Sequence, residues 1–166
     1  EVRAFIYIVT TAIVLIVINL MITGTGDLTL GQAIRHSAFT IASVISTTGY
    51  TTTDYNLWPL FSKIIIVAVM FVGACAGSTG GGIKVSRILI LFKGATHEIR
   101  RTIHPHQVKK ISLDKRIVEH ETVRSVNSFL FAYILIFAAS LLIISLDCKT
   151  FETAFTSVVA TINNVG

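Results

Sequence analysis

The chain has 166 residues, of which 52% are hydrophobic and only 14% are charged, and its formal net charge is +5. Soluble domains carry about 25% charged residues, so this composition favours a protein that lies in lipid over a soluble domain. Ten of the 14 Lys and Arg residues, against four acids, fall in residues 84–124. That segment flanks apolar runs and lacks interleaved aromatic residues, so it predicts a cytoplasmic loop between spans and argues against a nucleic-acid surface.

Two apolar runs are long enough to cross a bilayer. Residues 4–22 hold no charged residue in 19 positions, and residues 126–146 hold none in 21. About 20 apolar residues span a hydrocarbon core, so we expect two transmembrane helices, the alternative being core helices of a soluble protein. The chain opens at Glu1 without Met, and no small-residue cleavage site follows Ile22. We therefore expect the first run to be a span and not a signal peptide, and the chain to be part of a longer one.

A second, shorter helix follows the first run. Residues 23–27 (Thr-Gly-Thr-Gly-Asp) have turn chemistry, and residues 30–45 then form an apolar stretch with Arg35 and His36 near its start. As an α-helix this stretch is about 24 Å long, which is too short and too polar to span but suits a helix that re-enters the membrane. Residues 50–59 return to the interface, where Tyr55 and Trp58 are expected as aromatic anchors.

The end of that helix has the chemistry of a cation selectivity filter. Gly49 lies among hydroxyl residues and can adopt a positive φ, so that consecutive backbone carbonyls turn towards one axis and replace the water around an ion. The preceding helix points its partially negative C-terminal end at that ion. The alternative is a Thr/Gly-rich surface turn. The first candidate filter, with K⁺ bound at its carbonyls, comprises Thr47, Thr48, Gly49 and Tyr50.

The next apolar helix, residues 57–72 with Lys63 near its outer end, is expected to break at residues 73–82, and a helical pattern resumes at residues 83–92. Three successive glycines cost about 1 kcal/mol each in a helix interior. The run is not a phosphate-binding loop, because no strand precedes it and its lysine follows no glycine directly. We expect a gating loop beside the water below the filter, the alternative being a close helix contact. The candidate gate comprises Gly73, Gly77, Ser78, Thr79, Gly80, Gly81, Gly82 and Lys84.

The polar linker that follows carries four histidines, His97, His104, His106 and His120, whose spacing matches no zinc site. Cys75 and Cys148 lie too far apart in the expected topology for a disulfide or metal site.

The order of elements then repeats after about 117 residues, with a span at residues 126–146 and a re-entrant helix at residues 150–162. Ser-Ala-Phe-Thr at 37–40 is matched with Thr-Ala-Phe-Thr at 153–156. The second candidate filter comprises Asn163, Asn164, Val165 and Gly166.

These elements predict an all-α membrane protein built from span–pore helix–span units with re-entrant filter loops. Residues 1–93 form a complete unit with a broken second helix, residues 94–124 a cytoplasmic basic linker, and residues 125–166 the first half of the next unit. Four acids fall on the expected outer side, where they would concentrate cations at a pore mouth. They are Asp27, Asp54, Asp147 and Glu152. Asp54 is the preferred outer-mouth acid, whereas Asp27 and Asp147 are equally explained as ordinary loop acids.

The motifs at residues 46–52, 77–84 and 163–166 resemble those of the Trk/Ktr/HKT superfamily of potassium transporters, most closely its bacterial Trk-type membrane subunits. The resemblance covers nearly the whole chain and implies the third repeat and the start of the fourth in a four-repeat, channel-like fold. It implies potassium uptake across the cell (inner) membrane by a multi-pass protein in contact with lipid, commonly a homodimer, with a cytosolic nucleotide-binding regulatory ring as partner. Glycine at both filter positions, in place of serine, resembles the potassium-selective members.

Other functions are compatible with parts of the pattern. A secondary transporter of another small cation or solute would also use broken helices, and Na⁺ permeation or a purely structural membrane subunit stays open. A membrane enzyme needs convergent acid, base or nucleophile side chains in the spans, and Cys75 and Ser78 stand without a base. We therefore expect no enzyme activity, no cofactor and no nucleic-acid partner, with K⁺ as the transported ion.

Overall fold

The computed structural model describes residues 1–24, 28–103, 112–113, 116–117, 120–148 and 150–165. The predicted all-α fold is confirmed, apart from a two-residue antiparallel ladder. The helices are α1 (Val2–Thr23), α2 (Leu30–Ile45), α3 (Leu60–Val72), α4 (Val85–Ile103), α5 (His120–Ser145) and α6 (Phe151–Ile162), with a 3₁₀ turn at Tyr55–Leu57 and the strands β1 (Ser112–Leu113) and β2 (Arg116–Ile117).

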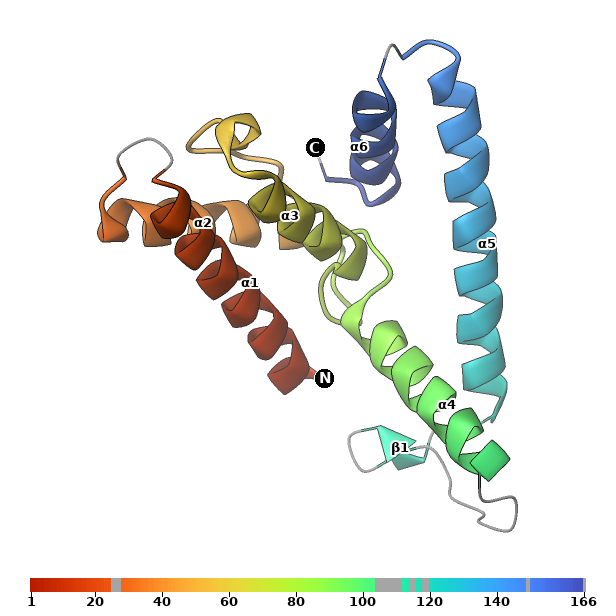
Figure 1. Cartoon of the computed structure of the whole chain (residues 1–166). Coiled ribbons are helices and arrows are strands. Elements are labelled where there is room, and N and C mark those ends of the chain that lie inside the picture. The colour runs from red at the N-terminus through yellow and green to blue at the C-terminus, as the bar shows by residue number, and fades with distance from the viewer. Residues whose placement is uncertain (25–27, 104–111, 114–115, 118–119, 149, 166) are drawn as a thin grey trace.

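Helices α1, α2 and α3 pack together around one apolar core. On α1 the buried residues recur every four positions, at Ala12, Ile16 and Leu20, so they form one stripe of the helix. This stripe meets buried side chains of α2 and α3, including Ile41 and Ile66. Helix α6 packs against both α5 and α3, and α4 packs against α5 (Figure 1). Helix α3 therefore joins the two halves of the chain.

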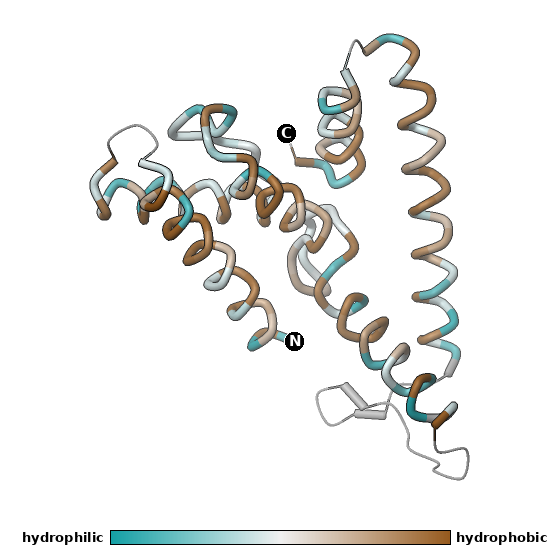
Figure 2. Tube along the Cα trace, in the orientation of Figure 1, coloured by the Kyte–Doolittle hydropathy of each residue, from teal (hydrophilic) through white to brown (hydrophobic). Residues whose placement is uncertain are grey.

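Helices α1 and α5 are both long and apolar enough to cross a membrane. Their 22 and 26 residues correspond to about 33 and 39 Å of helix. Only 17% of the most apolar window of α1, and none of that of α5, is buried within the chain. These are not the buried core helices of a soluble protein, and hydrophobic residues predominate along α1 and along α5 beyond its N-terminal end (Figure 2).

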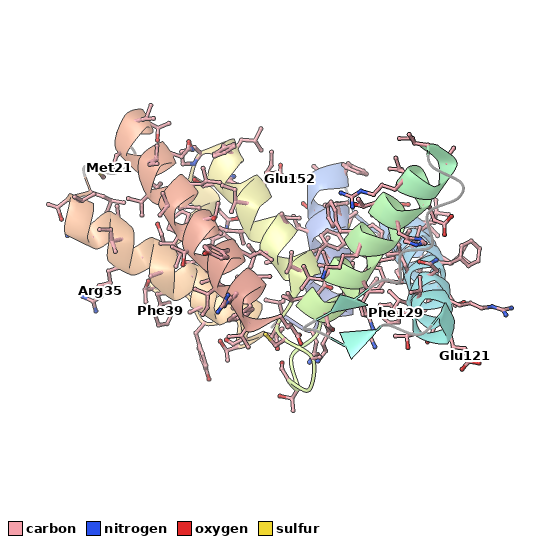
Figure 3. The ribbon with its side chains drawn as sticks, turned by 90° about the horizontal axis from the view of Figure 1, so that it is seen from below. Met21, Arg35, Phe39, Glu121, Phe129 and Glu152 are labelled. Carbon is pink, nitrogen blue, oxygen red and sulfur yellow. The ribbon has the colours of Figure 1, made fainter. Side chains whose placement is uncertain are left out.

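Helix α2 has the bounds expected for the re-entrant helix. Its start is fixed by a capping box, in which the Thr29 side chain accepts from the Gln32 amide and the Gln32 side chain accepts from the Thr29 amide. Arg35 and Phe39 project from the face of α2 that points away from α1 (Figure 3).

Two expectations for the return segment and α3 were wrong. Helix α3 begins at Leu60 and not at residue 57, because Pro59 restricts the residue before it to extended backbone, and Trp58 has φ −75° and ψ 154°. Trp58 is not an interfacial anchor but lies in the α1–α3 core, only 5% exposed, with Tyr55 packed against that core.

The helices extend further into the polar linker than the hydropathy pattern predicts. Helix α4 resumes at Val85 and continues to Ile103, and α5 begins at His120. The C-terminal end of α4 and the N-terminal end of α5 lie together at one end of the chain, opposite the connection between α5 and α6 (Figure 1). His104 and His106 lie outside the described residues.

Candidate functional site

The first candidate filter starts where α2 ends. Ser46 caps the helix, and the chain then tightens into a turn in which the Thr47 and Thr48 amides donate to the Val44 and Ser43 carbonyls, at 3.1 and 3.0 Å. Gly49 follows with φ +72°, the left-handed conformation that glycine adopts without strain. The prediction of a positive φ at this glycine is confirmed.

Hydrogen bonds from Ser and Thr hydroxyl groups within this turn stabilise it. Thr48 Oγ1 lies 3.2 Å from Ser43 Oγ and also donates to the Ser43 carbonyl, while Ser46 Oγ donates to the Ala42 carbonyl at 2.6 Å. The hydroxyl-rich sequence therefore fixes the backbone with local hydrogen bonds. Further along, His36 Nδ1 lies 3.1 Å from Thr52 Oγ1, so the outer part of α2 also contacts the segment that leaves the filter.

The second candidate filter repeats the backbone hydrogen bonds of the first. The amides of Asn163, Asn164 and Val165 donate to carbonyls four, three and five residues earlier, the pattern made by the residues 117 positions before them. Thr47 and Asn164, which are equivalent, have φ +58° and +56°. A β-branched residue in this region is strained, at a cost of about 1–3 kcal/mol, and such strain clusters at functional sites.

This register corrects one sequence correspondence. The tetrapeptides at 37–40 and 153–156 lie 116 positions apart, one fewer than the filter turns. Ser37 is therefore equivalent to Ala154 and not to Thr153, and both Ser37 and Ala154 are buried, whereas Thr153 is exposed. Helix α6 is also shorter than α2, with 12 residues against 16, because its capping residue Thr150 falls one turn later in the repeat.

Residues 73–82, the glycine-rich loop, do interrupt the helix. The amides of Ile83, Lys84 and Val85 donate to the carbonyls of Phe71, Val72 and Ala74, at 3.0 to 3.2 Å. The two ends of the loop are thus tied directly to each other. The expectation that a break would leave these groups dependent on water was wrong for these three pairs, because the ends of α3 and α4 satisfy one another.

Glycine is required where the loop closes. Gly73 and Gly82 have φ +65° and +81°, and a Cβ added to Gly82 would lie 2.8 Å from Gly73 Cα. No side chain fits between two backbones at that separation.

The tip of the loop lies against both candidate filters. A Cβ added to Gly81 would overlap the Asn163 carbonyl and lie 3.2 Å from Asn163 Cα. A Cβ added to Gly80 would lie 3.4 Å from Thr47 Oγ1. Asn163 and Thr47 lie in the turns that end α6 and α2, so the structure brings the predicted gate and the predicted filters together.

Lys84 is held by the loop that it follows. Its ammonium group donates to the Ser78 carbonyl, its side chain is half-buried, and its backbone has φ +78°. An ammonium group at membrane depth requires such a partner or water. Ser78 Oγ in turn accepts from the Gly80 amide at 3.1 Å, so Lys84 and Ser78 together order the loop.

Three of the four acids that were predicted to lie on the outer side are among the described residues. Asp54 is exposed, and its carboxylate accepts from the Asn56 amide at 2.9 Å, which caps the 3₁₀ turn. Asp147 and Glu152 are exposed near the start of α6, whereas Asp27 and Gly166 lie outside the described residues. Among the described residues no three His, Cys, Asp or Glu side chains converge on a metal site, and Cys75 and Cys148 are free thiols.

Sequence reasoning missed the polar side chains that connect the spans. Tyr133 on α5 donates to Asn163 Oδ1 at 2.8 Å, and Asn19 on α1 donates to the buried Ser62 of α3 at 3.4 Å. The available signal was a polar residue inside an apolar run, because such a residue needs a hydrogen-bond partner within the membrane.

Comparison with known proteins agrees with this geometry. A family model described as "Cation transport protein", TrkH, matches residues 3–166. The Trk system potassium uptake protein TrkH of Salmonella typhimurium is 39% identical over all 166 residues, and that of Escherichia coli K12 is 42% identical over 135 residues, or 81% of this chain. This chain covers 34% and 28% of those two proteins, so it spans about a third of the length of the relatives it matches.

A solved structure shows the same arrangement. The crystal structure of the potassium transporter TrkH from Vibrio parahaemolyticus superimposes with a TM-score of 0.90 at 34% sequence identity, over 99% of this chain and 35% of that one. The resemblance drawn from the filter and loop motifs is therefore confirmed, and the chain belongs to the TrkH family of cation transport proteins.

Proposed function

We propose that the protein to which this chain belongs takes up potassium ions across the cell membrane through a channel-like pore. The observation that carries the proposal is the contact of one glycine-rich loop with two filter-like turns whose backbone hydrogen bonds follow the same pattern. The relatives named above are potassium uptake proteins, which agrees with it.

In this proposal K⁺ is bound by backbone carbonyls at the ends of α2 and α6, where the negative ends of the two helices add to the attraction. The residues assigned to the filters are Thr47, Thr48, Gly49, Tyr50, Asn163, Asn164, Val165 and Gly166. The glycine-rich loop and Lys84 form the gate, because a loop beneath the filters obstructs ions until it moves and its lysine repels cations. Asp54 is assigned to the outer mouth, where an exposed carboxylate raises the local cation concentration.

The proposed topology follows the positive charge. Residues 84–124 face the cytoplasm and the filters open outwards, in the inner membrane of a bacterial cell. The chain divides into a complete unit (residues 1–93), a basic linker (94–124) and a half unit (125–166). The support is that α1 and α5 suit membrane spans and that the basic segment joins α4 to α5.

The remaining assignments concern the full-length protein. We propose that it is a homodimer in lipid, that a cytosolic nucleotide-binding ring regulates it, and that it has no enzyme activity, no cofactor and no nucleic-acid partner. The exposed apolar residues along α5, such as Phe131, Ile134 and Leu142, suit contact with lipid or with further helices of the protein.

The test is ⁸⁶Rb⁺ uptake by the full-length protein in cells that lack other potassium uptake systems. We expect uptake that unlabelled K⁺ inhibits at lower concentration than Na⁺. Uptake no greater than in cells without the protein would refute the proposal, and equal inhibition by Na⁺ would refute its potassium selectivity.

A further inference from the structure

The second candidate filter is held by a side chain from the neighbouring span. Asn163 is fully buried at the end of α6, and its amide oxygen accepts from the Tyr133 hydroxyl at 2.8 Å. Its amide nitrogen donates to the Val159 carbonyl, also at 2.8 Å. Both ends of the Asn163 side chain are therefore engaged, one by its own helix and one by α5.

The first candidate filter lacks this anchor. The residue 117 positions before Tyr133 is Ile16, which is apolar and fully buried in α1. The residue equivalent to Asn163 is Ser46, whose hydroxyl bonds to carbonyls of its own helix, at Ala42 and Ser43. Among the described residues, the two turns thus share a backbone but differ in what fixes them, and only the second is hydrogen-bonded by its side chain to another helix.

The ring of Tyr133 packs against α3 directly and reaches α4 through a second aromatic ring. It meets Phe71, in the last turn of α3, edge to face with ring centroids 6.4 Å apart, and Phe129 of α5 at 6.1 Å. The Arg87 guanidinium, in the first turn of α4, lies 4.1 Å from the centre of the Phe129 ring. Phe71 lies two residues before the loop and Arg87 five residues after it, so Tyr133 links the second candidate filter to α3 directly and to α4 through Phe129.

We propose that Tyr133 is a positioning residue for the second filter. Its hydroxyl orients the Asn163 amide, and thereby the Asn163 backbone that lies against Gly81, while its ring packs on Phe71 of α3 and on Phe129, which contacts Arg87 of α4. The inference rests on the proposed function, because it assigns to Tyr133 the ion preference of the second filter. The hydroxyl sets how well the filter fits an ion, whereas the loop sets how often ions pass.

The test uses Tyr133→Phe in the full-length protein, because this change removes the hydroxyl and keeps the ring contacts. We expect the ratio of K⁺ to Na⁺ transport to fall, and the KM for ⁸⁶Rb⁺ to change, by about threefold to tenfold, the usual effect of one hydrogen bond. The maximal rate per molecule in the membrane is retained. Tyr7→Phe, which removes a hydroxyl from an exposed tyrosine of α1, leaves ratio, KM and rate unchanged.

A double-mutant cycle with Asn163→Ala separates positioning from packing. If Tyr133 acts through the Asn163 side chain, Tyr133→Phe has no further effect in the Asn163→Ala background. Full additivity of the two changes would overturn the inference.

The inference would be overturned if Tyr133→Phe had the same ratio of K⁺ to Na⁺ transport and the same KM as a wild type that transports K⁺ selectively. The proposed function would not be affected by that result. A wild type without K⁺-inhibited uptake would overturn both.

Discussion

The contact between the glycine-rich loop and the second candidate filter predicts a large effect of Gly81→Ala on ion flux. The added methyl group would lie 2.5 Å from the Asn163 carbonyl carbon, a separation that forces one side to move. Asn163 is held by the α6 turn and by Tyr133, whereas the loop tip is fixed mainly by Ser78 and Lys84. We therefore expect the loop to give way.

The magnitude follows from the cost of overpacking. Inserting a methyl group into a packed site typically costs about 1–3 kcal/mol. Here the methyl group raises the free energy of the closed loop conformation and not that of the open one. Since each 1.4 kcal/mol is a factor of ten, the ratio of open to closed molecules rises about 5-fold to 150-fold. The flux rises by the same factor until the open form predominates, and K⁺ selectivity is retained because the filter keeps its hydrogen bonds.

The assay is the initial rate of ⁸⁶Rb⁺ uptake per molecule of full-length protein, with K⁺ and Na⁺ as competitors. Gly31→Ala is the matched control, because Gly31, like Gly81, has no positive φ, and no atom lies within 4 Å of a methyl group added to it. Equal flux in the two variants would refute the reasoning that the loop closes by contact with the filter. A loss of selectivity without a gain in flux would show that the filter, and not the loop, had moved.

Two further predictions concern the gate and the topology. Replacing Lys84 by Ala removes the hydrogen bond to the Ser78 carbonyl and the local positive charge, and deleting residues 80–82 removes the loop tip. Both variants are therefore expected to raise the maximal ⁸⁶Rb⁺ flux with selectivity retained. A flux that changes only in proportion to the protein level in both variants would identify the glycines as packing residues. In a background with Cys75 and Cys148 replaced by Ser, an impermeant thiol reagent applied to intact cells labels Asp54→Cys but not Lys109→Cys, and the reverse pattern would invert the topology.

The elements with strong local signals were predictable from the sequence. Helix α2 was predicted with its observed bounds from its apolar stretch and the hydroxyl–glycine run that closes it. The structure adds a Thr-x-x-Gln capping box at its start, a local signal that the prediction did not use. The break after Val72 was predictable because successive glycines disfavour a helix regardless of context. The start of α3 was also encoded, in the restriction that Pro59 places on Trp58, but the apolar pattern of residues 57–72 obscured it.

Features that depend on tertiary packing were not predictable. Tryptophan is typical of membrane interfaces, and only the packing of α1 on α3 shows that Trp58 is buried. The pairing of Tyr133 with Asn163 joins residues 30 positions apart on different helices, and the contact of Gly81 with Asn163 joins different repeats. A single sequence gives the periodicity of each helix but not the contacts between helices.

The most direct test of selective conduction through these turns is Gly49→Ser in the full-length protein. Serine at φ +72° adds a Cβ that disfavours this backbone conformation, so the carbonyls that replace the water around K⁺ are tilted out of place. The measurement is the ratio of K⁺ to Na⁺ flux through purified protein in lipid vesicles. The account predicts that the ratio falls in Gly49→Ser while the amount of folded protein is unchanged; the same ratio in wild type and variant would contradict it.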